Sequence, residues 1–439
     1  MSNLQIGLMS IVLILVLIQS GLHVAIALAA VSFFSVALIR GNFDVAGTFL
    51  SLAALESVAR YSFGVIPLFV LMGLLVGISG LGRDVFEVAG QLFRRLTGGL
   101  GIATVFANAI FAAVNGTSIA SASVFTRIAV PELLRSGYTR RFSVGVVAGS
   151  SVLGMLIPPS LLLILYGIIA EVSIGDLFTA GILPGIVLSL LFVATILLLA
   201  KFRPGFVLAK PEEGARSLVA DDLSPSQMIG KSAPVVLLIV IVLGGIYGGV
   251  FTPTEAGAVG ALAALVISVT RRSLGWRQFW GLLVETGRVT AAITFLIVAA
   301  HMYARLLALS GLPSQMNALI QHYELGLFAV MALYLLAIIA LGTILDSSSI
   351  MLIVLPLILP IMASFQVDLI WFGILTIVAV EVGLLTPPLG IACFVIKANL
   401  EKLDIPLNVI FAGAFPFVVA MLVMIGLVLL IPQLATALL

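Results

Sequence analysis

Asn115-Gly116-Thr117-Ser118 interrupts one long apolar run, and Gly154-Met155-Leu156-Ile157-Pro158-Pro159-Ser160 interrupts the next. Both patterns return 229 residues later, since 118 + 229 = 347. Their counterparts are Asp346-Ser347-Ser348-Ser349 and Gly383-Leu384-Leu385-Thr386-Pro387-Pro388. The same offset relates Pro131 to Pro360. Because several positions match in one register, the sequence predicts an internal repeat.

Composition defines the class of protein. Of 439 residues, 62% are hydrophobic and only 9% are charged, whereas a soluble chain carries about 25% charged residues. The chain is therefore predicted to be an all-α, multi-pass membrane protein, and its first apolar run to be a retained helix. Three histidines and the single Cys393 exclude a cysteine-rich metal site and a disulfide within the chain.

The repeat divides the chain into three parts. We predict a first repeat over residues 1–200, a polar cytoplasmic linker over 201–232 and a second repeat over 233–439. Each repeat is expected to hold a re-entrant helical hairpin followed by a helix broken at Pro-Pro: about 98–134 and 142–170 in the first, about 325–365 and 369–399 in the second. Two further segments, 44–61 and 276–288, are expected to be amphipathic helices in the interface plane.

Charged residues around the hairpins predict the topology. Arginines flank the first hairpin on both sides, which indicates that both flanks are cytoplasmic: Arg94, Arg95, Arg135, Arg140 and Arg141. No Lys or Arg lies within ten residues of the second hairpin, which predicts an external position. Five crossings per half then make the second repeat inverted and place both termini in the periplasm. Arg40 and Arg60 fall outside in this scheme, against the rule.

The four interruptions have a common chemistry. Irregular backbone in a bilayer is tolerated only where protein buries it or where it lines a water-filled cavity. Hydroxyls, Asn or Asp side chains and freed carbonyls are hard oxygen donors, suited to sodium. Helix N-termini at the same breaks suit a carboxylate. Inverted repeats with broken helices are typical of a secondary transporter.

Some polar residues also have a plain structural interpretation. Ser121, Ser123 and Thr126 can serve only to pack helices, whereas the charge of Asp346 in an apolar neighbourhood favours a cation nearby. We expect Glu255 to cap its helix.

The roles of four other charged residues stay open: Arg127, His301, Arg305 and Glu381. For Arg127 we favour the cytoplasmic headgroups over an anionic substrate. For His301 and Arg305, snorkelling to the external interface is as good an interpretation as a functional role. Glu381 could act at a hinge, in a salt bridge or as a ligand.

The motifs together resemble the large membrane subunit of tripartite ATP-independent periplasmic (TRAP) transporters. The resemblance covers essentially the whole chain, and these stretches carry it: Gly116-Thr117-Ser118, Pro131-Glu132, Gly137-Tyr138, Ile157-Pro158-Pro159-Ser160, Tyr166-Gly167, Ser173-Ile174-Gly175-Asp176-Leu177-Phe178, Thr252-Pro253-Thr254-Glu255-Ala256-Gly257 and Glu381-Val382-Gly383-Leu384-Leu385-Thr386-Pro387-Pro388-Leu389-Gly390. Arg127 and the pair His301 and Arg305 depart from what we expect of this family.

The resemblance implies an elevator-type carrier in the bacterial inner membrane. A periplasmic binding protein would deliver an organic acid, a separate small four-helix subunit would brace the scaffold, and sodium would drive uptake without ATP or a cofactor. No four-helix segment precedes Met1, so we expect that subunit to be a separate chain.

The resemblance also implies two sodium sites, carried over residue by residue. The first would use Asn115, Gly116, Thr117, Ser118, Gly154 and Pro158. The second would use Asp346, Ser347, Ser348, Gly383 and Thr386. Candidates for lining the substrate are Ser121, Pro159, Ser160, Ser349 and Pro388.

Three alternatives to this class of protein are a channel, an intramembrane hydrolase and a symporter that works alone. A channel would not need two opposed hairpins with Pro-Pro hinges. An intramembrane hydrolase would need a Ser–His or Asp–Asp pair, whereas His23, His301 and His322 lie near span ends. A sodium–anion symporter that works alone has a related architecture, and the genes beside this one would distinguish it from the subunit.

Overall fold

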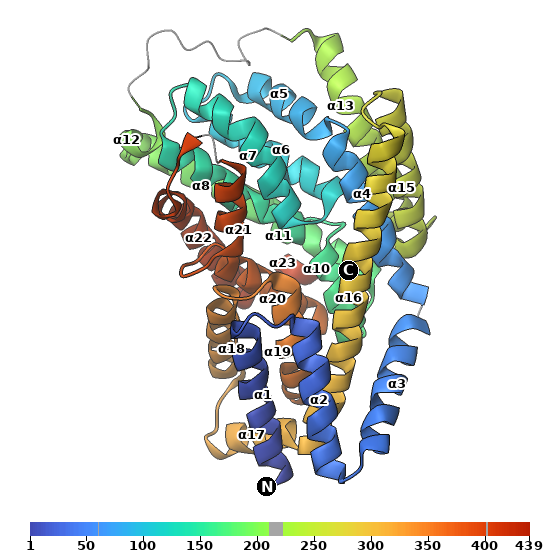
Figure 1. Cartoon of the computed structure of the whole chain (residues 1–439). Helices are drawn as coiled ribbons and strands as arrows, with labels where there is room; N and C mark the ends of the chain where they lie inside the picture. Colours follow the sequence, from blue (N-terminus) through green and yellow to red (C-terminus); the bar gives the residue numbers. More distant parts are fainter. Residues whose placement is uncertain (60, 210–222, 401–402) are drawn as a thin grey trace.

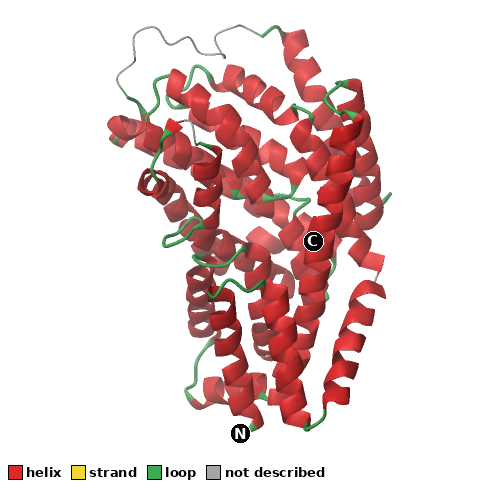
Figure 2. Ribbon diagram, viewed as in Figure 1, coloured by secondary structure: helices red, strands yellow, loops and turns green. Residues whose placement is uncertain are grey.

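The computed structural model describes residues 1–59, 61–209, 223–400 and 403–439, and these are almost entirely helical (Figure 2). No strand forms within these ranges, where a single antiparallel bridge joins Tyr138 to Leu208. Six of the described helices are long and apolar enough to cross a membrane, or eight if each of two bent pairs is one crossing. The predicted all-α, multi-pass architecture is confirmed.

The chain begins with a group of helices connected by short turns: α1 (Asn3–Gln19), α2 (Val24–Arg40), α3 (Phe43–Ala59), the 3-10 turn η1 (Tyr61–Gly64), α4 (Val65–Ile78) and α5 (Leu81–Phe93). α5 bends 61° away from α4. Its buried Leu81, Val85 and Ala89 recur every four residues, so one face packs on α6 and the charged residues lie on the other. There Glu87 pairs with Lys231 of α13, and Asp84 pairs with Arg271 after α15.

The first hairpin and first broken helix follow: α6 (Gly99–Asn115), α7 (Ser118–Arg135), α8 (Arg140–Ser151), α9 (Leu153–Leu156) and α10 (Leu161–Ala170). Then come α11 (Ile174–Phe202) and α12 (Pro204–Val207). Helix occupies both ends of the segment predicted as the linker, 201–232. Ser224 and Gln227 form a capping box, and Pro225 stands in the first turn of α13, so helix begins there. Residues 210–222 lie outside the described residues.

The second part contains α13 (Pro225–Ile239), a π-helical turn (Val240–Gly244), α14 (Gly245–Tyr247), α15 (Pro253–Thr270), α16 (Trp276–Ser310), α17 (Leu312–His322), α18 (Leu327–Gly342), α19 (Ser347–Ser364), α20 (Leu369–Leu384), α21 (Ile391–Asn399), α22 (Leu407–Leu430) and α23 (Gln433–Thr436). At the start of α15, Thr252 and Glu255 form a capping box. The capping role predicted for Glu255 is confirmed.

α16 corrects the expectation of a separate interfacial helix at 276–288. It is one helix of 35 residues that includes this segment and the span after it, and it runs along much of the molecule beside α2 and α3 (Figure 1). The first half is interrupted at η1, shortly before Pro67, whereas Leu296 stands at the matching place in the second half. Proline disturbs the preceding turn of a helix and leucine does not, which accounts for the difference.

α3 also differs from the expected amphipathic helix. Its small Ala46, Ala53 and Ser57 are buried, while Leu52 and Leu55 are exposed. The outward side therefore carries large apolar side chains beside Glu56, not a polar face. Arg60 lies outside the described residues.

The helices before the two Pro-Pro breaks are deeply buried. Every residue of α8 from Phe142 to Ser151, and of α20 from Trp371 to Leu384, is buried. Both pack on α22. At the α8–α22 crossing, a Cβ added to Gly145 would lie 2.1 Å from the carbonyl oxygen of Gly413, so only glycine fits.

Candidate functional site

The tip of the first hairpin is a tight turn that its own side chains stabilise. α6 ends at Asn115, Gly116 takes the left-handed conformation (φ +72°), and α7 begins at Ser118. The Asn115 side-chain amide donates to the carbonyl oxygen of Thr117 at 3.1 Å. Behind the tip, a Cβ on Gly73 of α4 would lie 2.7 Å from the Asn115 carbonyl oxygen. The oxygen-rich turn is therefore held from both sides.

The first Pro-Pro break lies directly against this tip. The Leu161 amide donates to the Gly116 carbonyl oxygen at 3.0 Å. A Cβ on Gly116 would lie 2.7 Å from the carbonyl oxygen of Pro159, and one on Gly154 would lie 2.7 Å from that of Thr117. The Pro158–Pro159 peptide bond is cis. Hence the residues proposed for the first sodium site converge in space.

The second tip is built around a helix cap. α18 ends at Gly342, and Asp346 caps α19. One carboxylate oxygen of Asp346 accepts from the Ser349 backbone amide at 3.2 Å, and the other accepts from the Ser349 hydroxyl. The side chain of Asp346 is only partly buried. Its visible role is therefore to start α19.

The second Pro-Pro break contacts the second tip in a similar way. The amides of Leu389 and Gly390 donate to the Thr343 carbonyl oxygen at 3.1 and 3.2 Å. Gly390 stands 229 residues after Leu161 (390 − 161), so corresponding residues in the two halves bond to their own tips. A Cβ on Gly383 would lie 2.5 Å from the Cα of Gly342. The Pro387–Pro388 bond is also cis.

Glu381 brings the two tips together. Its Oε1 accepts from the Ser118 hydroxyl at 3.4 Å and from the Ser347 hydroxyl at 3.1 Å. Ser118 and Ser347 are the first residues of α7 and α19, so two helix N-termini meet one carboxylate. Glu381 is 2% exposed and forms no ion pair among the described residues. The salt-bridge interpretation is wrong, and Glu381 contacts both tips.

Among the serines proposed to line the substrate, Ser121 has a free hydroxyl within the described residues, whereas Ser160 and Ser349 are already hydrogen-bonded. Ser121 is buried one turn beyond Ser118, and its hydroxyl has no hydrogen-bond partner in the described part of the chain. Ser160 caps α10 and donates to Met155, and Ser349 is bonded to Asp346. Pro159 is buried and Pro388 is exposed.

The remaining residues proposed for the second sodium site lie at the same tip and break. Ser348 is partly buried beside Ser347. Thr386 is also partly buried, and its hydroxyl donates to the Val382 carbonyl oxygen at 2.7 Å.

Arg127 was predicted to reach the lipid headgroups, but in the structure its side chain bonds to another helix. Its Nε donates to the side-chain oxygen of Asn399 at 2.7 Å, and Ser123 donates to the same oxygen at 3.3 Å. Asn399 ends α21, which follows the second break. This contact therefore ties the first hairpin to the second broken helix. Sequence spacing gave no signal for it, because the residues are 272 apart.

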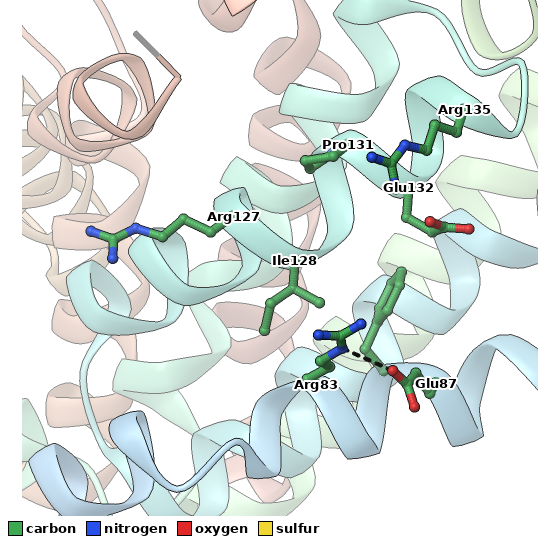
Figure 3. Close-up of a pocket in the computed structure, with 8 residues that line it drawn as sticks. Arg83, Glu87, Arg127, Ile128, Pro131, Glu132 and Arg135 are labelled. Atoms are coloured by element: carbon green, nitrogen blue, oxygen red, sulfur yellow. Dashed lines mark hydrogen bonds and ion pairs between the residues drawn. The ribbon is translucent and has the colours of Figure 1, made fainter. Parts of the chain in front are cut away.

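Figure 3 shows a pocket of about 290 Å³ between α5 and α7 near Arg127. Arg83 pairs with Glu87 there at 2.9 Å, while Arg127 points away from that pair. The side chains of Glu132 and Arg135 lie farther along α7. Because the three guanidinium groups do not converge, the pocket does not form an anion site.

His301 and Arg305 do not extend freely toward the membrane interface, because both side chains bond to a neighbouring helix. Arg305 pairs with Glu56 at 2.5 Å and lies over the ring of Phe49, and the His301 ring hydrogen-bonds to Ser57 at 2.7 Å. All three partners belong to α3. The polar face of α16 therefore fastens α3 to α16.

Comparison with known proteins shows which family the chain belongs to. A family model described as tripartite ATP-independent periplasmic transporter, DctM component, matches residues 11–434. The chain belongs to this family. The resemblance predicted from the motifs is thereby confirmed.

Several relatives of similar length are named for the substrate that they transport. The chain is 34% identical to the C4-dicarboxylate TRAP transporter large permease protein DctM of Pseudomonas aeruginosa, over 89% of this chain and 88% of that protein. It is 29% identical to the sialic acid large permease protein SiaM of Vibrio cholerae, over 86% of each. It is also 29% identical to the 2,3-diketo-L-gulonate large permease protein YiaN of Escherichia coli, over 85% of each.

A solved structure shares the fold. The crystal structure of the Alcanivorax borkumensis YdaH transporter, which has an unusual topology, aligns with a TM-score of 0.60. The alignment covers 85% of this chain and 87% of that one at 14% identity, so it shows likeness of fold alone.

Proposed function

We propose that this DctM-family protein carries out sodium-coupled secondary uptake of a carboxylate-bearing organic acid that a periplasmic binding protein delivers. It would work in the bacterial inner membrane by elevator-type alternating access, beside a small four-helix subunit. Two relatives are long enough to include a further subunit, since this chain covers 55% of the permease protein DctMQ and 58% of SiaT.

One observation carries the proposal: the N-termini of α7 and α19 meet at the same buried carboxylate. Each N-terminus presents unpaired amides and about half a positive charge. Two such ends at one place suit an anionic group, as in secondary transporters built from broken helices. The dicarboxylate, sialic acid and diketogulonate named for the relatives are all organic acids.

The sodium sites are proposed at the two tips. At the first tip, the Thr117 carbonyl oxygen lies against Gly154, and Gly116 lies against Pro159, next to Pro158. At the other tip, the proposed ligands are the oxygens of Asp346, Ser347 and Ser348, with those of Gly383 and Thr386 after the second hairpin. Hard cations prefer such oxygen ligands. A helix break supplies them because it frees carbonyl groups from the helical ladder.

Uptake by the reconstituted complex tests the proposal. Proteoliposomes would contain the protein with its small subunit, and uptake of the labelled acid would be followed with and without the binding protein. We expect uptake only with an inward sodium gradient, and no effect of ATP. Equal uptake in potassium buffer without a gradient would contradict the coupling. Full uptake without the binding protein would favour the symporter that works alone, and rates without saturation would favour a channel.

A further inference from the structure

Arg127, Ser123 and Asn399 form a polar contact between the two halves of the chain. The Arg127 Nε donates to the Oδ1 of Asn399 at 2.7 Å, and the Ser123 hydroxyl donates to the same oxygen at 3.3 Å. The Asn399 amide donates to the Val395 carbonyl oxygen of its own helix at 2.8 Å, which turns Oδ1 toward α7. The acceptor is therefore held in place, and both donors come from the first hairpin.

The contact lies equally far along both helices from the candidate site. Arg127 is nine residues after Ser118, the first residue of α7 (127 − 118). Asn399 is nine residues after Gly390, which directly precedes α21 (399 − 390). Nine residues of helix are about 14 Å long, and so short a helix bends little. A bond between the far parts of α7 and α21 therefore fixes the first tip relative to the second Pro-Pro break.

The second half is built without such a contact. At the offset of 229, the counterpart of Arg127 is Pro356 and that of Asn399 is Ala170. Neither side chain can form a hydrogen bond, and both line a cavity of about 340 Å³ between α10, α16 and α19. The repeated arrangement of helices therefore forms without this contact, so packing alone does not explain its presence in the first half.

We propose that Arg127 is a positioning residue for substrate binding. Through Asn399 it holds the first tip at the separation from the second break that the organic acid requires, without touching the acid itself. The proposal rests on the proposed transport function. Arg127 is exposed, and exposed polar contacts contribute little to stability, so its loss should change the geometry of the site and leave the fold intact.

Two spin labels measure the positioning directly. Ile119 at the start of α7 and Leu389 in the second break are 39% and 43% exposed, so a cysteine at each position can carry a label. The buried Cys393 would be replaced by Ser. In the purified complex we expect one narrow distribution of distances between the labels.

Variants of the contact should broaden this distribution. Arg127→Ala and Asn399→Ala should each do so, and the double variant should broaden it no further, because both changes remove the same contact. Arg135→Ala is the control, since it removes an equal charge farther along α7 (Figure 3). It should leave the distribution narrow.

Uptake of the labelled acid by the reconstituted complex shows whether the position sets affinity. Arg127→Ala and Asn399→Ala should each raise the KM about two- to thirtyfold, with the maximal rate and the melting temperature nearly unchanged. Arg127→Lys keeps a donor and Asn399→Asp keeps an acceptor, so both should retain most of the affinity. A purely structural role would lower the maximal rate and the melting temperature instead.

Three results would overturn the positioning role. The first is an unchanged distance distribution in Arg127→Ala and Asn399→Ala, whatever the uptake assay shows. The second is an unchanged KM in both variants. The third is a raised KM in Arg127→Ala alone, because the charge of Arg127 would then act on the anion by itself. If the wild-type complex shows no uptake, the transport function fails, and the distances alone decide whether Arg127 fixes the tip.

Discussion

Asp346 caps α19, and the second proposed sodium site uses the same carboxylate. Asparagine caps a helix about as well as aspartate but has no charge. We expect Asp346→Asn to change the free energy of unfolding by less than about 0.5 kcal/mol. Loss of a charged ligand should raise the sodium concentration for half-maximal uptake about tenfold. Sodium titration of uptake, together with thermal unfolding, measures both.

The matched control is Asp368→Asn. Asp368 caps α20 by accepting from the amides of Ile370 and Trp371, and it lies outside both tips. It should leave the sodium dependence unchanged. If Asp346→Asn also leaves it unchanged, Asp346 is a helix cap and no more.

Two features of the structure at Gly116, its backbone conformation and its close contact with the first Pro-Pro break, exclude alanine. Its φ of +72° is unfavourable for other residues, and a Cβ would lie 2.7 Å from the Pro159 carbonyl oxygen. The left-handed conformation alone costs about 1–2 kcal/mol. We expect Gly116→Ala to lower thermal stability clearly more than Gly137→Ala, whose φ is +81° but whose Cβ would meet nothing within 4 Å. Equal losses would show that the tip and the break are not in close contact.

At the scale of the elements, the crossing of α8 and α22 depends on two glycines. A Cβ on Gly145 would lie 2.1 Å from a backbone oxygen, which no rotamer change can relieve. Gly145→Ala should therefore separate the two helices and lower the melting temperature. Gly426→Ala on α22 meets nothing within 4 Å, and it should add about 0.5–1 kcal/mol of helix stability. Opposite shifts in thermal unfolding are expected, and a stabilised Gly145→Ala would contradict the packing.

The elements themselves were predictable where short-range signals decide them. Pro-Pro pairs and polar tetrads interrupt apolar runs, and helices in the structure end there. The segment 276–288 was misassigned because its polar composition suggested a separate helix, although no proline interrupts it. Helix α13 begins inside the segment predicted as the linker, because Ser224 and Gln227 form a capping box there. The inverted arrangement of the repeats stays a prediction.

For the whole molecule, the site could be predicted only in part. The shared offset singles out the tips and the breaks, because each is a local pattern that recurs. Glu381 is different: its contacts are 263 and 34 residues away, and only the packing of α7, α19 and α20 brings them together. The Asn399 contact of Arg127 and the α3 contacts of Arg305 were missed for the same reason.

In the proposed transport cycle, the two hairpins move as a block against the rest of the protein. Ala304 of α16 and Ala363 of α19 line one cavity of about 340 Å³, with α16 on one side and the second hairpin on the other. Cysteines at both positions, with the buried Cys393 replaced by Ser, would report their separation.

Crosslinking of this pair in the reconstituted complex, with a short bifunctional thiol reagent, tests the claim most directly. Alternating access predicts that substrate plus sodium changes the crosslinking yield and that the crosslinked protein does not transport. An identical yield in every condition, with transport intact after crosslinking, would contradict the moving block and favour a gated pore around fixed hairpins.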